Sequence, residues 1–195
     1  MKARRAFSLV ELLCTIAILA ILTVVMTNHG SASAQKRARV ACQNNLEKIA
    51  LALSLYSSDH RGAYPFLDGA ATSESVLSLL VPRCTTMTEI FICPGSKDKE
   101  LPEGESFAGS IISYAYYMGR ASNDDPSFIL VSDAQVNNLA KVTGQPLFSA
   151  TGKKPGNNHG KTGGNLLQAG GAVHFSPPAA DLDLPLDFKV HLLNP

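Results

Sequence analysis

The first residues of the chain combine a cation cluster, a bond that a protease could cut, and a carboxylate in an apolar run. Met1–Arg5 carries three positive side chains, and Glu11 is the single charged residue in Phe7–Met26. A carboxylate inside a membrane costs roughly 2.5–3.5 kcal/mol at the helix centre, and less near the end. Cleavage between Ala6 and Phe7 would turn the Phe7 nitrogen into a cation four residues before Glu11.

The new amine and the Glu11 carboxylate would find each other most readily between two copies of the helix. If one copy is shifted along its axis, the Phe7 amine of one helix reaches the carboxylate of the other in a low dielectric. Polar pairs of this kind fix how membrane helices pack. The sequence therefore predicts processing at Ala6 and Phe7, followed by assembly through Phe7 and Glu11.

The apolar run that holds Glu11 is long enough to cross a membrane. A spanning helix needs about 20 apolar residues, and Phe7–Met26 supplies that length. The leading basic residues predict a cytoplasmic N-terminus, which would place the rest of the chain in the periplasm. The cations Lys36, Arg37 and Arg39 just past the run are interpreted as a solvated helix face.

Residues 4–13 read Arg-Arg-Ala-Phe-Ser-Leu-Val-Glu-Leu-Leu. This segment resembles the prepilin cleavage and methylation signal of type IV pilins and type II secretion pseudopilins. The resemblance implies that a prepilin peptidase cuts after Ala6 and methylates Phe7, and that Glu11 acts in assembly. It also implies other pilin or pseudopilin subunits and inner-membrane lipid as partners. The family prefers Gly before the cut, where this chain has Ala6.

Two other export signals fit parts of the same segment. A secretory signal with an A-x-A-like site at Ala32–Ala34 would give a mature chain beginning at Gln35. The pair Arg4-Arg5 also fits a twin-arginine signal. Both expect a shorter and purely apolar core, which Glu11 interrupts. Gln35 as the first residue of the mature protein would eliminate the pilin hypothesis.

The length of 195 residues suggests one domain plus an anchor. We expect a leader over 1–6, a transmembrane helix over 7–26, its periplasmic continuation over 27–60, and a globular head over 61–195. One apolar helix face recurs at steps of three and four: Cys42, Leu46, Ile49, Leu53 and Tyr56. A single helix from residue 7 to about residue 59, with a weak point near Gly30, would be roughly 80 Å long.

The head is predicted to contain a short helix and several strands. Ser73–Val81 reads as a helix stopped by Pro82. Strands are expected at 89–92, 111–118, 128–132, 165–168, 172–175 and, at an edge, 188–192. Ala169–Gly171 predicts a hairpin, and Gly152–Gly164 predicts a mobile loop. The fold class is α+β: a long N-terminal helix packed on a small antiparallel sheet, in a pilin-like layout.

Four cysteines occur in the chain. Cys14 lies in the apolar run as a small apolar residue, and Cys42 lies on the continuing helix. An oxidising periplasm would permit a Cys84–Cys93 disulfide, although spacing alone cannot establish its geometry. Zinc is not expected, because there is no C-x-x-C pair and no His at ligand spacing from Cys84 or Cys93.

His159, His174 and Asp133 could form a metal or acid–base cluster if the fold brings them together. The alternative is that His159 hydrogen-bonds within its loop and His174 packs beside the hairpin. No G-x-S-x-G, P-loop or H-E-x-x-H motif occurs, so we expect no enzyme. The net charge of +1 with no basic stripe downstream of the leader predicts no nucleic-acid partner.

The sequence predicts no cofactor, with calcium as the one candidate. Carboxylates at alternate positions could hold it, and the late aspartates are Asp181, Asp183 and Asp187. The resemblance to pseudopilins raises this expectation, because major pseudopilins of type II secretion carry a calcium site in a late loop. An EF-hand loop is absent from the sequence.

Residues 42–56, followed by Gly62-Ala63-Tyr64-Pro65, resemble the helix exit of many bacterial pseudopilin-like proteins. Two further segments resemble one large subgroup of them: Phe91-Ile92-Cys93-Pro94 and Ser113-Tyr114-Ala115-Tyr116. The subgroup ends with His, nine residues and Asp-Gly, whereas His159 is followed ten positions later by Ala169-Gly170. The expected function is a structural subunit of a secretion or pilus filament. A membrane-tethered binding module and an exported protein with a cleaved signal remain the alternatives.

Overall fold

The computed structural model describes residues 8–195, and the side chains of residues 27–32 are not described. The processing residues Ala6 and Phe7 therefore lie outside the described residues. The chain divides into two compact units, Met1–Arg37 and Ala38–Pro195, and each is described by itself. The second unit contains the sheet and is called the head unit here.

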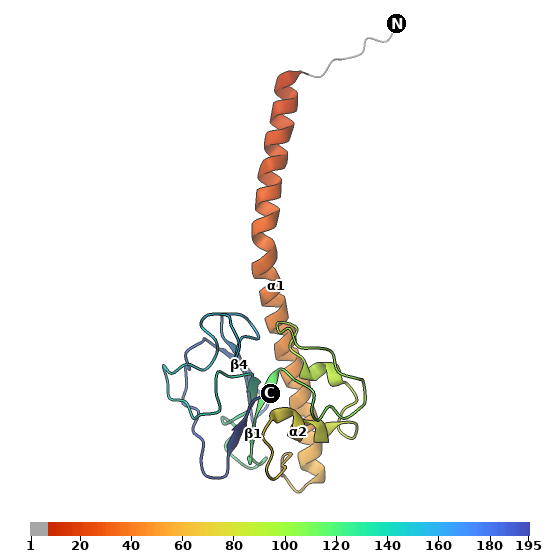
Figure 1. Ribbon diagram of the computed structural model, residues 1–195, viewed down its shortest axis with the longest axis vertical. Coiled ribbons are helices and arrows are strands. Elements are labelled where there is room, and N and C mark those ends of the chain that lie inside the picture. Colours follow the sequence, from red (N-terminus) through yellow and green to blue (C-terminus); the bar gives the residue numbers. More distant parts are fainter. Residues whose placement is uncertain (1–7) are drawn as a thin grey trace. The chain divides into compact units, whose positions relative to one another are not determined.

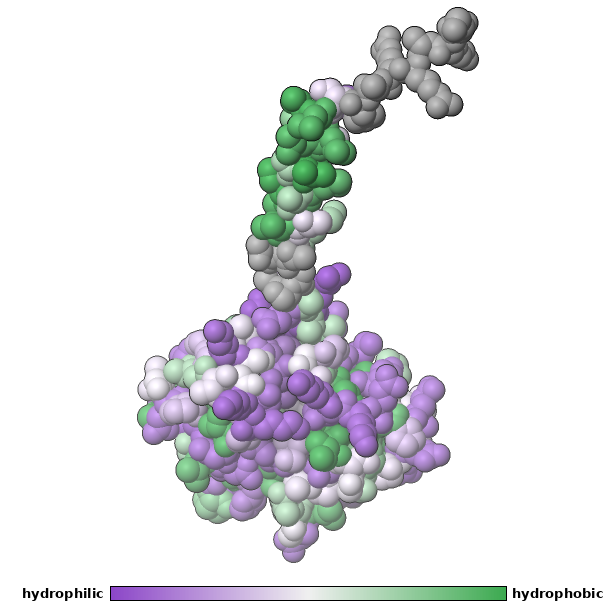
Figure 2. Space-filling view, turned by 45° about the horizontal axis from the view of Figure 1, so that its top comes forward, coloured by the Kyte–Doolittle hydropathy of each residue, from purple (hydrophilic) through white to green (hydrophobic). Residues whose placement is uncertain are grey.

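Helix α1 runs from Leu9 to Asp59, as the sequence predicts, and contains no proline. In the first unit, its stretch Leu9–Met26 is long and apolar enough to cross a membrane. No side chain of this stretch is buried, and Figure 2 shows its surface as almost entirely hydrophobic. Fully burying a Leu or Ile side chain is worth about 1.5–3 kcal/mol, so this surface favours lipid or the apolar faces of other helices.

In the head unit, α1 buries the apolar face predicted from the periodicity. Cys42, Leu46, Ile49 and Leu53 are fully buried, and they join a core with the inner face of the sheet. The helix closes through a hydrogen bond of 2.8 Å from the Gly62 nitrogen to the carbonyl oxygen of residue 57. Gly62 has φ of 89°, a conformation that suits glycine at the end of a helix.

The head contains one five-stranded sheet in which every neighbouring pair is antiparallel (Figure 1). The strand order is β4-β3-β2-β1-β5. The strands are β1 (Tyr114–Met118), β2 (Ile129–Asp133), β3 (Gly164–Gln168), β4 (Val173–Ser176) and β5 (His191–Leu193). The predicted hairpin joins β3 to β4, and the edge strand predicted at 188–192 begins only at His191, as β5 beside β1.

Both faces of the sheet are buried, because successive side chains of β1 point to opposite sides. Tyr114, Tyr116 and Met118 belong to the core that contains α1. Ala115 and Tyr117 belong to a second core on the other face. That face is covered by segments without long helices or strands, which contribute Leu147, Phe148, Ala180, Leu184 and Val190.

Three sequence predictions differ from the structure. The predicted strand at 89–92 is wrong, because Thr88–Phe91 forms a 3-10 helix, η2, that turns Ile90 and Phe91 into the core together. The predicted helix at 73–81 is divided into α2 (Ser73–Leu77) and a 3-10 turn, η1 (Ser78–Leu80). The strand predicted to begin at residue 111 begins at Tyr114, after a loop whose Ser110 nitrogen bonds the Phe107 carbonyl.

Arg39 fastens α1 to β4 within the head unit. Its guanidinium carbon lies 4.2 Å from the centroid of the Phe175 ring. Arg39→Ala is expected to lower the free energy of unfolding by about 0.5–2 kcal/mol, since a cation over an aromatic face contributes this much. Urea unfolding in detergent, followed by near-ultraviolet circular dichroism, measures it. Lys36→Ala, a change at an exposed cation, is the control, and equal effects of the two changes would contradict the role of Arg39.

Candidate functional site

Glu11 lies in the first turn of α1, with an exposed side chain. Within residues 8–195, no hydrogen bond or ion pair engages its carboxylate. The apolar stretch Leu9–Met26 around Glu11 contains no Lys or Arg that could pair with the carboxylate, as the sequence predicts. A carboxylate in this position therefore depends on a group outside the described part of the chain or on another molecule.

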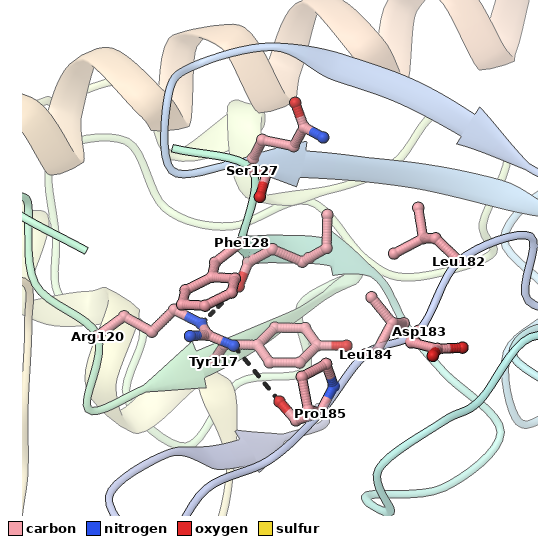
Figure 3. Close-up of a pocket in the computed structure, with 10 residues that line it drawn as sticks. Tyr117, Arg120, Ser127, Phe128, Leu182, Asp183, Leu184 and Pro185 are labelled. Atoms are coloured by element: carbon pink, nitrogen blue, oxygen red, sulfur yellow. Dashed lines mark hydrogen bonds between the residues drawn. The ribbon is translucent and has the colours of Figure 1, made fainter. Parts of the chain in front are cut away.

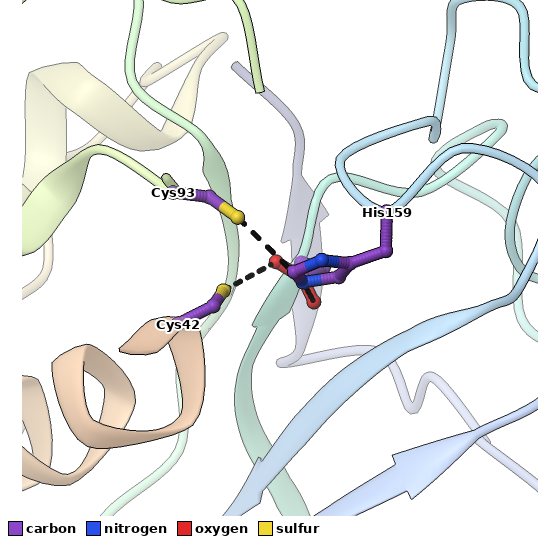
Figure 4. A group of neighbouring side chains, drawn as sticks. Cys42, Cys93 and His159 are labelled. Atoms are coloured by element: carbon purple, nitrogen blue, oxygen red, sulfur yellow. Dashed lines mark hydrogen bonds and ion pairs between the residues drawn. The ribbon is translucent and has the colours of Figure 1, made fainter. Parts of the chain in front are cut away.

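A second group of reactive side chains is buried inside the head unit. Cys42, Cys93, Asp133 and His159 each direct one ligand atom toward a common point, and these four atoms lie within 4.8 Å of one another. Figure 4 shows Cys42 on α1, Cys93 on the segment after η2, and the His159 ring converging from separate parts of the fold. Every one of the four residues is buried. This set is called the buried tetrad below.

Asp133 is the centre of the tetrad, at the last position of β2. Its Oδ1 accepts hydrogen bonds from Cys42 Sγ at 3.1 Å and from Asn158 Nδ2 at 2.9 Å. Its Oδ2 accepts from the backbone nitrogen of Asn165 at 2.6 Å and lies 3.2 Å from His159 Nε2. A buried carboxylate is tolerated only when such partners replace water. The loop and strand around it therefore fold to supply donors.

The two thiols and the imidazole complete the tetrad. Cys93 Sγ lies 3.6 Å from His159 Nε2 and accepts a hydrogen bond from the Gly95 nitrogen at 3.3 Å. Cys42 Sγ also lies 3.1 Å from the Tyr114 hydroxyl oxygen. Glycine is required at position 95, because a Cβ there would lie 2.4 Å from the carbonyl oxygen of the residue before His159.

The local charges shift the pKa values of the tetrad. The hydrogen bond with Cys42 and the hydrogen bond and charge of His159 together lower the pKa of Cys93 to about 7, against the opposing effects of burial and of Asp133. Burial acts to lower the pKa of His159, but bonds and charges from Asp133 and Cys93 outweigh it and raise the pKa to about 10. Burial raises the pKa of Cys42 well above its ordinary value. The site thus favours an imidazolium beside anionic partners when no other cation is present.

The structure brings together two of the three residues in the predicted His/His/Asp cluster. Asp133 and His159 belong to the tetrad, whereas His174 lies on β4 with its Nε2 3.8 Å from an Asp181 oxygen. The hypothesis of one cluster is therefore wrong for His174. Sequence reasoning also missed Cys42 as a site residue, because it lies on a helix far along the chain from its partners.

Cys84 and Cys93 are both free thiols in the structure, as are Cys14 and Cys42. Cys93 is buried beside Cys42, and Cys84 is half-buried with its pKa raised by burial and by Asp59. Cys93 lies beside Cys42 in the fold, and the Cys84–Cys93 disulfide stays a prediction. The fold favours this arrangement because Cys42 faces the sheet on the buried stripe of α1.

The late aspartates make separate contacts. Asp183 Oδ1 accepts hydrogen bonds of 2.8 Å from both the backbone nitrogen and the hydroxyl of Thr143. Asp187 Oδ1 accepts from the backbone nitrogens of Lys189 and Val190. Among the described residues, these aspartates do not form a group of three acidic or metal-binding side chains. Their carboxylates cap turns in the segment that covers the outer face of the sheet.

A groove of about 370 Å³ lies on the outer face of the sheet, between β2 and the segment at 182–185 (Figure 3). Its buried cation is Arg120, whose Nε donates to the Ile129 carbonyl at 3.0 Å and whose guanidinium lies 4.4 Å from the Phe128 ring centroid. A further donor, Nη2, reaches the Pro185 carbonyl at 3.5 Å. These contacts hold Arg120 in a structural role that joins β2 to the covering segment.

Residues 1–27 match the family model of the prokaryotic N-terminal methylation motif. This match covers the basic leader, Ala6, Phe7, Glu11 and the apolar stretch of α1. No curated protein and no solved structure matches the chain. The apolar helix fits single-pass anchoring in the inner membrane. The chain therefore carries a prepilin-type signal, of the kind processed by prepilin peptidase, on an α+β fold of pilin-like layout.

Proposed function

We propose that the chain is a non-enzymatic structural subunit, a pseudopilin or minor pilin, of a type II secretion or type IV pilus-like system. Prepilin peptidase removes residues 1–6 and methylates Phe7. The mature subunit then enters a filament, with its N-terminus at the cytoplasmic side of the inner membrane before assembly and its head in the periplasm. The observation that carries the proposal is the methylation motif at residues 1–27, which includes the exposed apolar stretch Leu9–Met26 of α1.

Assembly follows from the surface of the first unit. Its apolar side chains leave lipid only if the same faces of other subunits replace the lipid around them. Glu11 opposes burial in an apolar filament core unless a cation neutralises it. The Phe7 amine that cleavage creates is such a cation, and it is available on every neighbouring copy. Processing and assembly are therefore coupled: the cut that releases the leader also produces the partner of Glu11.

The test is the chemical state of the mature N-terminus. We expect the protein purified from cells with an active prepilin peptidase to begin at methylated Phe7 in mass spectrometry. The same cells without the peptidase are the control and should yield an uncut chain beginning at Met1 or Lys2. A Gln35 start would instead indicate a secretory signal, and an intact leader in peptidase-positive cells would indicate a tethered binding module. Either result would overturn the proposal.

A further inference from the structure

We propose that Cys42, Cys93, Asp133 and His159 form a structural zinc site that joins α1 to the sheet. This inference is independent of the proposed function, because it concerns the head unit alone. Two thiolates, one imidazole and one carboxylate are a ligand set that zinc accepts. Soft sulfur ligands beside nitrogen also favour zinc over calcium or magnesium, which prefer oxygen alone.

The distances between the ligand atoms match the size of such a site. A tetrahedral zinc ion with bonds of about 2.0–2.3 Å separates its ligand atoms by roughly 3.3–3.8 Å. Cys93 Sγ lies 3.6 Å from His159 Nε2, and the Asp133 carboxylate approaches both sides of the site, with Oδ2 at 3.2 Å from His159 Nε2 and Oδ1 at 3.1 Å from Cys42 Sγ. All four ligand atoms lie within 4.8 Å of one another, so a small inward shift would bring them to the spacing of ligands around one ion.

His159 Nε2 faces two acceptors of the tetrad, the Asp133 carboxylate and Cys93 Sγ. His159 Nε2 lies within contact distance of Asp133, Cys93 and the Asn165 amide nitrogen, but one ring N–H can serve only one acceptor. The other ring nitrogen, Nδ1, is buried and has no hydrogen-bond partner in the described part of the chain. One cation at the centre would engage the imidazole, the carboxylate and both sulfurs at once.

The surroundings of the tetrad resemble the outer shell that orients metal ligands. The Gly95 nitrogen donates to Cys93 Sγ, and the Asn158 amide and Asn165 backbone nitrogen donate to Asp133. With both thiols deprotonated, the ligands carry three negative charges against two on the ion, so these donors offset the excess. Binding releases the thiol protons to solvent and changes no oxidation state.

One zinc ion would hold together four separate segments of the head unit. Cys42 lies on α1, Cys93 follows η2, Asp133 ends β2 and His159 precedes β3. A closed four-ligand site contributes to folding rather than to chemistry. Zinc would therefore fix the head-unit part of α1 against the sheet.

The test uses the full-length chain, purified in detergent with a reductant. We expect about one zinc ion per chain, and cobalt substitution should give absorption bands of thiolate-to-cobalt charge transfer and tetrahedral geometry. At a zinc concentration one hundred times the dissociation constant, the melting temperature should rise by about 5–10 °C over the chelated protein. Cys42→Ser and His159→Gln should lose the metal, whereas Cys84→Ser should keep it.

A second measurement avoids variants that fail to fold. Zinc should slow the alkylation of Cys42 and Cys93 in the unmodified chain at least tenfold, with no effect on the half-buried Cys84, which serves as an internal control. The proposal is overturned if the reduced chain neither retains nor takes up zinc or cobalt. It is also overturned if cells treated with a thiol-blocking reagent at lysis yield a Cys42–Cys93 disulfide in the mature protein.

Discussion

Asp133→Ala is expected to lower the free energy of unfolding of the reduced, chelated chain by about 3–5 kcal/mol, which is the usual cost of removing one partner from a buried charged pair. The change removes the carboxylate beside His159 Nε2, the acceptor of the Asn165 nitrogen, and one of the two acceptors of the Asn158 amide, which keeps its bond to the Ser113 carbonyl. Since none of these groups can reach water in the folded head, each retains part of its desolvation penalty. The prediction concerns the metal-free protein and does not depend on zinc.

Urea unfolding in detergent, followed by the near-ultraviolet dichroism of the buried tyrosines of β1, measures this loss. Asp181→Ala is the matched control, because the Asp181 side chain is exposed and its one ion pair within the described part of the chain is with His174, at 3.8 Å. Its effect should stay within about 0.5 kcal/mol, as for most surface changes. Asp133→Asn keeps one acceptor oxygen and should fall between the two. A loss below about 1 kcal/mol for Asp133→Ala would show that the tetrad does not hold the head together.

The sequence predicts the parts of the fold that depend on local patterns. The apolar steps from Cys42 to Leu53 predict the buried face of α1, and the Ala169–Gly171 turn predicts the β3–β4 hairpin. The strand predicted at 89–92 failed because Ile90 and Phe91 are adjacent apolar residues, and such a run fits a buried turn of helix as well as a strand. The packing of both side chains into the core favours the helical turn, and this packing is not visible in the local sequence.

The tetrad could not be predicted from spacing, because its members come from four segments that meet only in the folded head. The loop at 152–164 illustrates the reason. Its Gly, Lys and Asn composition predicts a mobile loop, yet Asn158 and His159 are buried where Asp133 needs donors. Segments that contain Cys42, Cys93 and His159 do stand out in the sequence, but each segment was treated separately. Considered together, those segments could have indicated a shared site.

Glu11→Ala is expected to leave cleavage and methylation unchanged and to reduce incorporation into the filament by roughly 5- to 30-fold. This factor corresponds to about 1–2 kcal/mol, the contribution of a polar contact between helices in an apolar environment. Cleavage is unaffected because the cut bond lies five residues before Glu11 and the leader is retained. Incorporation falls because the methylated Phe7 amine then enters the filament without a carboxylate to pair with.

The measurement compares the variant with the parent chain in sheared filament fractions, after mass spectrometry has established that both begin at methylated Phe7. Glu47→Ala is the matched control, since Glu47 is an exposed carboxylate on the same helix but lies in the head unit, outside the apolar stretch. Glu11→Gln keeps hydrogen bonding without the charge and should be intermediate. If Glu11→Ala enters filaments as well as Glu47→Ala does, the carboxylate has no role in subunit register. The apolar contacts of α1 alone must then set the axial shift between neighbouring subunits, because every apolar side chain of the helix is retained in the variant.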